Sequence, residues 1–383
     1  MMRIFLKLFL FIFFSNFLIS KSFSEVTMSG YQEFFAGSAD QSTRGALDMS
    51  TNTGVSQGGL SNGSYTRLVA TASATLDNGI EVIGVYSIMK DDKSGGDTDV
   101  LGVSTNQNDI SLSGGFGTFT IGNTGSTGSM MHYRASTIIP TAEPDGAVIG
   151  HFYSGGSNDY GRADEVGYAE DSMKVRYLSN VYEGFSFGIQ YGSSLRSTPA
   201  RTSGSDKNCS TASDQTGHGC YTDVIDAVVK YEGTFDGITI GATYGMIGGN
   251  TNIIAGAEYN DLEADIFTAN VGYGGLTVQY KYQDTADSGQ LKSTTDDGDN
   301  TGSTLCGVYA AGNVTAGICG VETEFKESGV TAKNDSKTMV YGLGYNLGGG
   351  VMLEAAYFSV EQSQGATKDT DADGVISKIS FGF

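Results

Sequence analysis

Hydrophobic and polar residues alternate along most of the chain after residue 24. Between residues 185 and 192, apolar side chains occupy every second position, and small or polar side chains fill the positions between them. The same alternation recurs at residues 238–245, 276–282 and 339–347. A period of two puts the apolar side chains on one face of a β-strand, whereas an amphipathic helix needs them three or four residues apart. The pattern therefore predicts a chain built almost entirely of β-strands.

The connections between the predicted strands alternate between very short turns and long polar stretches. The seven short turns are at 77–79, 114–117, 181–184, 235–237, 273–275, 312–313 and 348–350. The eight long stretches are 39–63, 91–99, 123–170, 194–222, 247–257, 285–303, 327–337 and 362–373. This division predicts sixteen antiparallel strands, with both ends of the chain on the side of the short turns.

Two architectures use half-apolar strands of this kind. In a soluble β-sandwich the apolar face points to a core, whereas in an outer-membrane barrel it points to lipid and the small, polar face lines water. A sandwich has no reason to separate short from long connections, but a membrane barrel has short periplasmic turns and long outer loops. Strands of about 9–11 residues would also match a tilted span of the bilayer. We therefore predict an all-β fold, a 16-stranded antiparallel transmembrane barrel.

Residues 1–24 have the three parts of a secretory signal peptide. Arg3 and Lys7 give a basic start, residues 8–19 are almost all Phe, Leu and Ile, and Ser22 and Ser24 are small residues at the positions that signal peptidase reads. A membrane anchor is the alternative, but the apolar run is short for a spanning helix. We expect export, removal of residues 1–24, and a mature barrel domain of residues 25–383.

The composition agrees with a barrel and excludes several other classes of protein. The chain has 56 Gly without a collagen period and only 3 Pro, which argues against collagen and against a disordered linker protein. Its 43 acidic and 22 basic residues give a net charge of −21, which excludes a nucleic-acid partner because phosphates attract a basic surface. Only 17% of the residues are charged, as expected when a large surface must face lipid.

Several segments resemble known outer-membrane proteins. The last strand ends in Phe381 and Phe383 on one face, which resembles the assembly signal of bacterial outer-membrane proteins. Residues 25–31, 115–122 and 341–350, taken in their order along the chain, resemble the general trimeric porins of alphaproteobacteria. The chain departs from that family by its complete lack of Trp, which leaves the interfacial belts to Tyr and Phe.

This resemblance implies a function and a set of partners. It implies a homotrimer in the cell outer membrane, in contact with membrane lipid and lipopolysaccharide, with a water-filled channel for passive diffusion of small hydrophilic solutes and ions. The excess of acidic residues favours a weak preference for cations. A substrate-selective nutrient channel of the same fold is the first alternative, and an outer-membrane enzyme or adhesin is the second.

The resemblance also implies where the channel is narrow. In the family, the third long loop, here residues 123–170, folds into the barrel. Glu143 and Asp145, beside two prolines, are the candidates for its acidic tip.

The opposite wall of the channel should carry basic residues that face the lumen. The alternation in their strands places the side chains of Arg67, Lys174 and Arg176 there. An acidic loop against a basic wall would produce a transverse field that sets ion preference. Alternatively, these charges are simply solvated lumen side chains.

The four cysteines suit an oxidising compartment. Cys306 and Cys319 are equidistant from the turn at 312–313, so a two-residue turn would make them face each other at a non-hydrogen-bonded pair, where a disulfide is plausible. Cys209 and Cys220 both lie in the fourth long stretch and could cross-link its tip. Other pairings and reduced thiols remain open.

Metal binding and catalysis have little support in the sequence. Asp369, Asp371 and Asp373 resemble the start of a calcium loop, but the twelfth position, which should be Glu, is Ser380. We expect an acidic outer loop there, with at most weak calcium binding, and no other cofactor. Such carboxylates could also bridge lipopolysaccharide through divalent ions.

The chain has three histidines, all of them in long loops. These residues, His132, His151 and His218, have no Ser, Cys or Asp at a spacing that suggests a catalytic site. We therefore do not expect an enzyme.

Overall fold

A computed structural model describes the barrel and part of its loops. The described residues are 25–42, 60–93, 103–140, 172–196, 220–251, 253, 256–292, 299–326, 333–364 and 368–383. The predicted signal peptide, residues 1–24, lies outside these ranges, and its cleavage stays a prediction. No helix among the described residues is long and apolar enough to cross a membrane.

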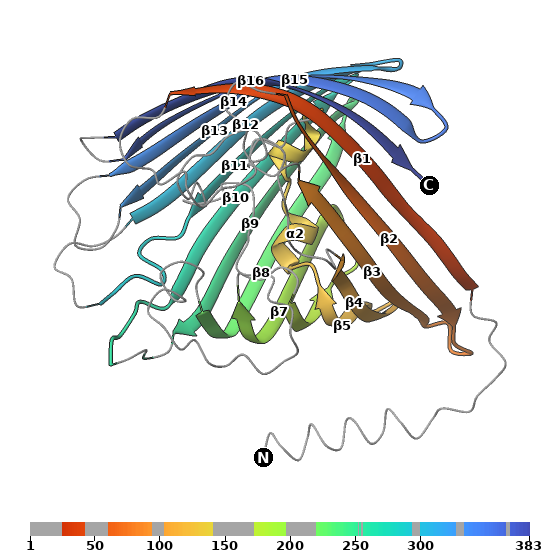
Figure 1. The fold of residues 1–383 in the computed structure, drawn as a ribbon. Helices are drawn as coiled ribbons and strands as arrows, with labels where there is room; N and C mark the ends of the chain where they lie inside the picture. Colours follow the sequence, from red (N-terminus) through yellow and green to blue (C-terminus); the bar gives the residue numbers. More distant parts are fainter. Residues whose placement is uncertain are drawn as a thin grey trace.

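Sixteen antiparallel strands form one closed barrel (Figure 1). Each strand pairs with its neighbours in sequence, and β1 pairs with β16 to close the ring. Closure leaves no strand with an unpaired backbone edge, which a protein in lipid requires. The strands are β1 (Glu25–Ser42), β2 (Ser61–Thr75), β3 (Glu81–Lys93), β4 (Val103–Gly114), β5 (Gly117–Thr124), β6 (Ser172–Leu178), β7 (Phe185–Arg196), β8 (Cys220–Phe235), β9 (Ile238–Thr251), β10 (Leu262–Tyr273), β11 (Leu276–Asp284), β12 (Asp299–Ala311), β13 (Val314–Lys326), β14 (Asn334–Gly348), β15 (Val351–Gln364) and β16 (Lys368–Gly382). The predicted fold class is confirmed.

All seven predicted short turns join consecutive strands at one end of the barrel. The turn between β8 and β9 shows why such turns can be recognised. Asp236 and Gly237 both have positive φ, 47° and 80°, which suits the tight hairpin turn that matches the twist of its strands. Asp and Gly tolerate this backbone better than other residues do.

The strands are longer than the alternation predicted. We expected about 9–11 residues from the thickness of a bilayer, but β1 has 18 residues and β8 has 16. Hydropathy marks only the part of a strand that faces lipid, whereas backbone pairing continues beyond it. Gln41 on β1, for example, still pairs with Ala372 on β16, within stretches that we had assigned to loops.

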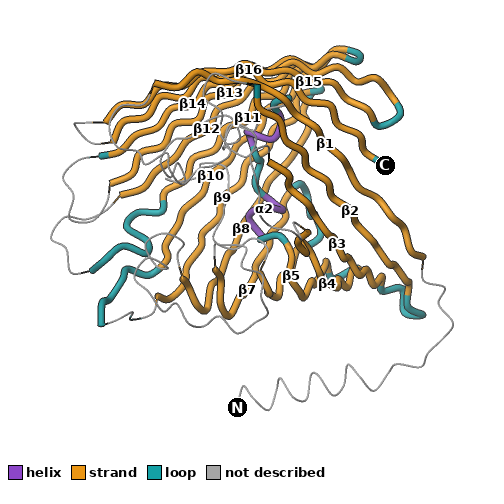
Figure 2. The backbone as a smooth tube through the Cα atoms, viewed as in Figure 1, coloured by secondary structure: helices purple, strands orange, loops and turns teal. Residues whose placement is uncertain are grey.

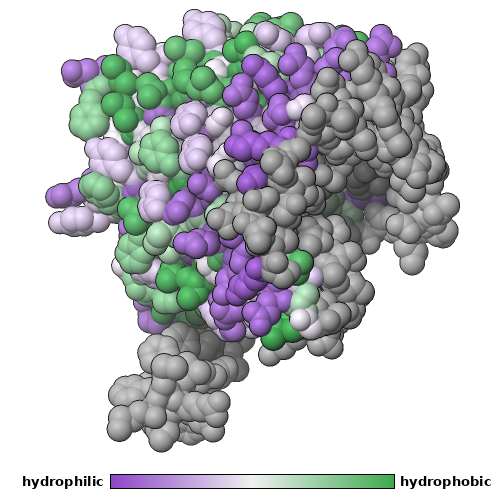
Figure 3. All heavy atoms as spheres, turned by 90° about the vertical axis from the view of Figure 1, so that its left-hand side faces the viewer, coloured by the Kyte–Doolittle hydropathy of each residue, from purple (hydrophilic) through white to green (hydrophobic). Residues whose placement is uncertain are grey.

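The two faces of the wall differ in chemistry, as expected for a barrel in lipid. Large apolar side chains such as Phe187, Tyr244 and Phe267 are exposed on the outer face. The alternate positions of the same strands face inward, and residues there such as Gln190 and Thr268 are polar and buried. In Figure 3, hydrophobic residues gather on the left of the molecule and strongly hydrophilic ones towards its middle. The wall is therefore apolar towards lipid and largely polar towards the lumen.

Part of the lumen wall is apolar, which the sequence did not predict. One cluster of buried residues lies on the inner faces of β1 and β12–β16 and includes Phe35, Val340, Phe358 and Ile376. Residues of the third loop, described below, belong to the same cluster. On this side of the barrel the lumen contains a packed core.

Candidate functional site: a loop segment across the channel

The chain turns into the barrel directly after β5 (Figure 2). A short helix, α2 (Thr127–Met131), contacts β7 and β8, and a 3-10 turn, η1 (Ala135–Ile138), contacts β11, β12 and β13. We call residues 125–140 the inner loop segment. The segment thus runs from one side of the lumen to the other, which confirms the predicted inward fold of the third loop for these residues. Residues 141–171 lie outside the described part of the chain.

Two of the predicted wall residues hold the start of this segment. Lys174 donates a hydrogen bond to the carbonyl of Thr124, and Arg176 donates one to the carbonyl of Gly125. Both face the lumen as predicted, but they are only 3% and 5% exposed. The prediction that they line the open channel opposite the loop was wrong, because the loop itself covers them. They anchor it instead.

The helix α2 is bound to the wall through its own N-terminus. A helix begins with N–H groups that have no partner within the helix. The Ser126 hydroxyl accepts from the N–H of Ser129 as an N-cap. The N–H of Thr127 donates to Gln190 on β7 at 2.7 Å, and that of Gly128 donates to the Asp226 carboxylate on β8 at 2.9 Å. Both wall residues are almost fully buried, so these bonds are shielded from water.

His132 continues the attachment beyond α2. Its Nδ1 lies 2.5 Å from the Thr243 hydroxyl on β9, which in turn hydrogen-bonds to Thr268 on β10. The N–H of Tyr133 also donates to the Thr268 hydroxyl, at 3.1 Å. Burial, together with the positive charge of Lys281, lowers the pKa of His132 to about 3. The imidazole is therefore neutral throughout the physiological pH range.

Tyr133 joins the segment to a charged pair on β8. Its hydroxyl donates to the Glu232 carboxylate, and its ring lies 4.4 Å below the ammonium of Lys230. Lys230 and Glu232 form an ion pair at 3.3 Å. Burial, then the hydrogen bond to Glu232, raises the pKa of Tyr133. The phenol therefore remains a donor, and three side chains hold one another in place.

Glycines on the inner wall make room for the segment. A Cβ on Gly245 would lie 2.6 Å from Nε2 of His132, and one on Gly241 would overlap the Tyr133 hydroxyl. At the other end, a Cβ on Gly342 would lie 2.5 Å from the carbonyl oxygen of Pro140. Real Cβ atoms do not make such contacts, so any larger residue would displace the segment. Part of the high glycine content therefore forms the seat of this loop.

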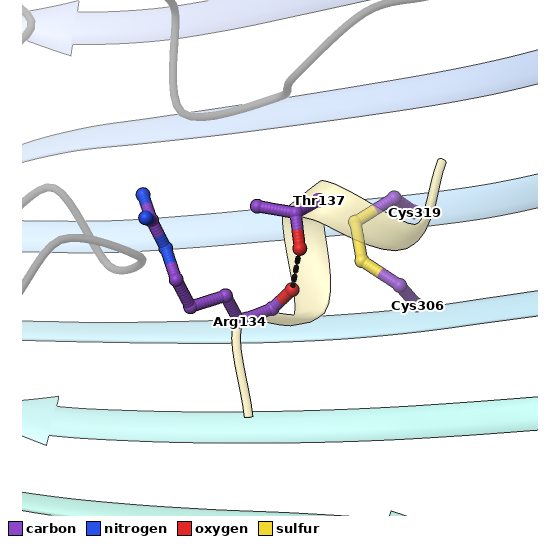
Figure 4. Close-up of a disulfide and its surroundings, with 4 residues drawn as sticks. All are labelled: Arg134, Thr137, Cys306 and Cys319. Carbon is purple, nitrogen blue, oxygen red and sulfur yellow. Dashed lines mark hydrogen bonds between the residues drawn. A yellow bond between two sulfur atoms is a disulfide. The ribbon is translucent and has the colours of Figure 1, made fainter. Parts of the chain in front are cut away.

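A disulfide lies beneath the far end of the segment (Figure 4). It joins Cys306 on β12 to Cys319 on β13 at directly opposite positions, the pairing that the turn spacing favoured. Both sulfurs belong to the apolar lumen cluster, together with Ala135 and Ile139 of the segment. The Arg134 side chain points away from the disulfide (Figure 4). This end of the segment thus packs its apolar residues against the wall. Arg134, a basic residue of the segment, was not among the predicted site residues.

The other residues proposed for the constriction are not brought together in the described part of the chain. Glu143 and Asp145 lie outside the described residues. Arg67 lies on the inner face of β2, where its guanidinium donates to Gln107 at 3.2 Å and to Ser87 at 3.4 Å. The acidic loop tip against a basic wall therefore stays a prediction, with Arg67 as its wall residue.

The acidic series near the C-terminus was assigned to the wrong kind of structure. Asp369, Asp371 and Asp373 lie in β16, not in a loop. Alternate residues of a strand are about 7 Å apart, so these residues run along the strand and do not converge as a calcium loop requires. Among the described residues, no group of three or more His, Cys, Asp or Glu side chains could hold a metal ion.

The remaining candidates are placed as follows. Cys220 is the first residue of β8 rather than part of a loop, and Cys209 lies outside the described residues. Phe381 and Phe383 are exposed at the end of the chain, where the backbone of Phe383 bonds to Gly30 on β1. Their role as an assembly signal stays a prediction.

The residues with the most contacts to the inner loop segment were not predicted from the sequence. Lys230, Tyr133 and Glu232 were not among the residues proposed for the constriction. The one available signal was the run of glycines at alternate inner positions of β9, which marks a place where something packs closely.

Comparison with known proteins identifies the family. The model of the Gram-negative porin family matches residues 10–373. The chain belongs to the Gram-negative porin family. It is therefore an outer-membrane channel for passive diffusion. Sequence comparison with functionally curated proteins found no significant match.

Solved structures of outer-membrane proteins share the fold at low sequence identity. An anion-selective porin from Comamonas acidovorans is 13% identical, with a TM-score of 0.58 over 94% of this chain and 100% of that one. The in-vitro folded, trimeric form of the outer-membrane protein OmpT from Vibrio cholerae is 14% identical, with a TM-score of 0.57 over 94% and 99%. A mutant Rh. blastica porin is 16% identical, with a TM-score of 0.53 over 94% and 100%. At these identities the likeness concerns the fold alone.

Proposed function

We propose that this porin is a general diffusion channel whose narrowest part is formed by the inner loop segment. The observation that carries the proposal is the attachment of this segment on both sides of the lumen, to β7–β10 through hydrogen bonds and to β12–β14 through apolar packing. A loop fixed in this way reduces the open cross-section permanently. Solutes would then be selected by size and charge, with no bound cofactor and no chemical step.

A weak preference for cations is part of the proposal. The chain has 43 acidic and 22 basic residues, and Lys174 and Arg176 are buried under the loop, which withdraws two positive charges from the open channel. Glu143 and Asp145 would supply the acidic side of the constriction, and Arg67 the basic side. The anion-selective porin from Comamonas acidovorans shares this fold, so ion preference must come from such local charges.

The partners follow from the same proposal. The trimer form of a structural neighbour supports assembly as a homotrimer. Lipopolysaccharide would contact the outer face, where the exposed carboxylates of Asp371 and Asp373 suit bridging by divalent ions. We propose no enzymatic role, since the described histidine is neutral and holds the loop to the wall.

Conductance measurements test the channel directly. The protein, purified from outer membranes and added to planar lipid bilayers, should insert in steps that each open a stable, ohmic conductance. Neutral sugars of increasing size should pass more slowly in a liposome-swelling assay, with a sharp cut-off at the width left by the loop. A protein that inserts as a folded barrel but carries no current would overturn the proposal.

A further inference from the structure

A cavity of about 290 Å³ lies on the periplasmic side of the inner loop segment. It is bounded by α2 above, by the end of β6 and the turn that follows it, and by the inner face of β8. The residues that matter for its chemistry are Met130, Met131, Leu178, Val181, Lys230 and Glu232. A solute that has crossed the loop segment meets this cavity before it leaves the channel.

One side of the cavity is apolar although it borders a water-filled lumen. Met130 is 57% exposed and Val181 is 71% exposed, while Met131 and Leu178 form the deeper part. Neighbouring exposed apolar side chains are typical of a binding surface, because covering them with an apolar group removes them from water. Methionine adapts its shape to different apolar groups, so this side suits apolar side chains of more than one form.

The other side of the cavity presents two opposite charges in a fixed arrangement. Lys230 and Glu232 are 3.3 Å apart and keep 26% and 48% of their side chains exposed, so a solute can reach both. Tyr133 holds the pair from behind, through its hydroxyl on Glu232 and its ring against Lys230. Because the two side chains are already ordered, a solute that binds them causes little further loss of side-chain conformational entropy.

We propose that this cavity is a binding subsite for α-amino acids with apolar side chains. An α-amino acid carries its ammonium and its carboxylate on the same carbon atom, so it can place the ammonium on Glu232 and the carboxylate on Lys230 at the same time. Its apolar side chain would then cover Met130, Leu178 and Val181. The volume is at the lower end of the roughly 300–1,000 Å³ of small-molecule sites, which suits a single amino acid better than a peptide.

The inference rests on the proposed channel function and makes it more specific. A binding subsite in a diffusion channel raises flux at low solute concentration but slows it when the site is full. The porin would therefore combine general diffusion with saturable passage of apolar amino acids.

Single-channel recording with L-leucine tests the proposal. Leucine added on the periplasmic side should produce brief interruptions of the ion current whose frequency saturates. Glycine lacks the apolar part, 4-methylpentanoate lacks the ammonium and 3-methylbutylamine lacks the carboxylate. Each should interrupt the current at about tenfold higher concentration or not at all, because a charge-assisted hydrogen bond or a buried apolar side chain is lost.

Variants locate the subsite. Lys230→Gln combined with Glu232→Gln should lengthen the time between interruptions about tenfold. The matched control is Lys337→Gln with Glu322→Gln, which removes an ion pair of similar length, 3.2 Å, on the outer face and should leave leucine interruptions unchanged.

Since Lys230 and Glu232 also hold Tyr133, Val181→Ser provides a second test. It touches no anchor of the loop and should shorten each leucine event.

The outcomes separate this proposal from the channel function itself. Channels that conduct normally but show no interruptions by leucine would overturn the subsite and leave the porin intact. Equal interruptions in wild type, in the Lys230 and Glu232 double variant and in Val181→Ser would also overturn it. Absence of any conductance would instead overturn the channel on which it rests.

Discussion

At the scale of single residues, the protonation of His132 makes the attachment of the inner loop segment depend on pH. Its imidazole is neutral because burial and Lys281 disfavour the charged form, which lowers its pKa from 6.5 to about 3. A lowered histidine pKa means that the attached loop binds fewer protons than the released loop. The stabilisation is complete above about pH 6.5 and is lost as the pH falls towards 3.

The loop should therefore loosen in acid. At pH 5 the attachment of His132 should be weaker by about 2 kcal/mol than at pH 7, because each pH unit below the free pKa costs about 1.4 kcal/mol. We expect more current noise and brief closures between pH 6 and pH 4 in single-channel records. In His132→Gln, which can still bond to Thr243 but does not titrate, this change should be much smaller. Equal acid noise in both proteins would show that another group is responsible.

At this scale, the sequence predicted which side chains face the lumen. It did not predict which other parts of the chain bury them. Lys174 and Arg176 were correctly assigned to the lumen because side chains alternate along a strand. Their role was wrong because the carbonyls that cover them belong to Thr124, the last residue of β5, and Gly125, the first residue of the inner loop segment. Both lie about fifty residues away in the sequence, and no local pattern reports such a contact.

At the scale of elements, the inner loop segment and its glycine seat form one unit. The turns between strands were predictable because Asp-Gly and Gly-Asn sequences suit backbone conformations that few other residues adopt. The ends of the strands were not, since polar residues pair beyond the lipid as readily as apolar ones. The helix α2 was also unpredictable, because its five residues are stabilised mainly by bonds to the wall and not by their own sequence.

Filling the seat should move the loop. Gly342→Ala places a methyl group 2.5 Å from the Pro140 carbonyl and 3.0 Å from the Ile139 side chain, so the segment must shift at a cost of about 1–3 kcal/mol. The single-channel conductance and the size cut-off for sugars should both change. Gly84→Ala on β3 is the control, because nothing lies within 4 Å of its added methyl group. A conductance that is unaltered in Gly342→Ala would show that this end of the segment does not shape the channel.

The disulfide should stabilise the barrel more than it shapes the channel. The disulfide joins two residues that are 13 positions apart in the sequence. By restricting the unfolded chain, a cross-link of this size is expected to raise the free energy of unfolding by roughly 3 kcal/mol. Cys306→Ala with Cys319→Ala should lower the urea midpoint for unfolding in detergent, while the open-channel conductance stays near that of wild type. Reductant should act slowly on the folded protein, because the two cysteines are at most 1% exposed. Equal urea midpoints for oxidised and alanine proteins would contradict this expectation.

At the scale of the whole molecule, the basic and acidic side chains of the lumen differ in their environment. Lys378 on β16 is buried between Glu33 and Glu354, at 3.3 and 2.9 Å, so one lysine neutralises only one of two lumen carboxylates. Lys174 and Arg176 are buried under the loop, where Asp226 lies near them. The positive charges of the wall are therefore largely committed to structural contacts, and the acidic excess of the chain is left to act on permeating ions.

Neutralising the proposed loop tip should reduce cation preference. In Glu143→Gln with Asp145→Asn, two negative charges are removed from the proposed constriction. An ion about 4 Å from a unit charge in water gains about 1 kcal/mol, so the ratio of potassium to chloride permeability should fall a few-fold. The reversal potential under a potassium chloride gradient measures this ratio. Glu322→Gln with Glu324→Gln is the control, since both carboxylates are paired with lysines outside the channel. If the two double variants shift the reversal potential equally, selectivity comes from the overall charge and not from the constriction.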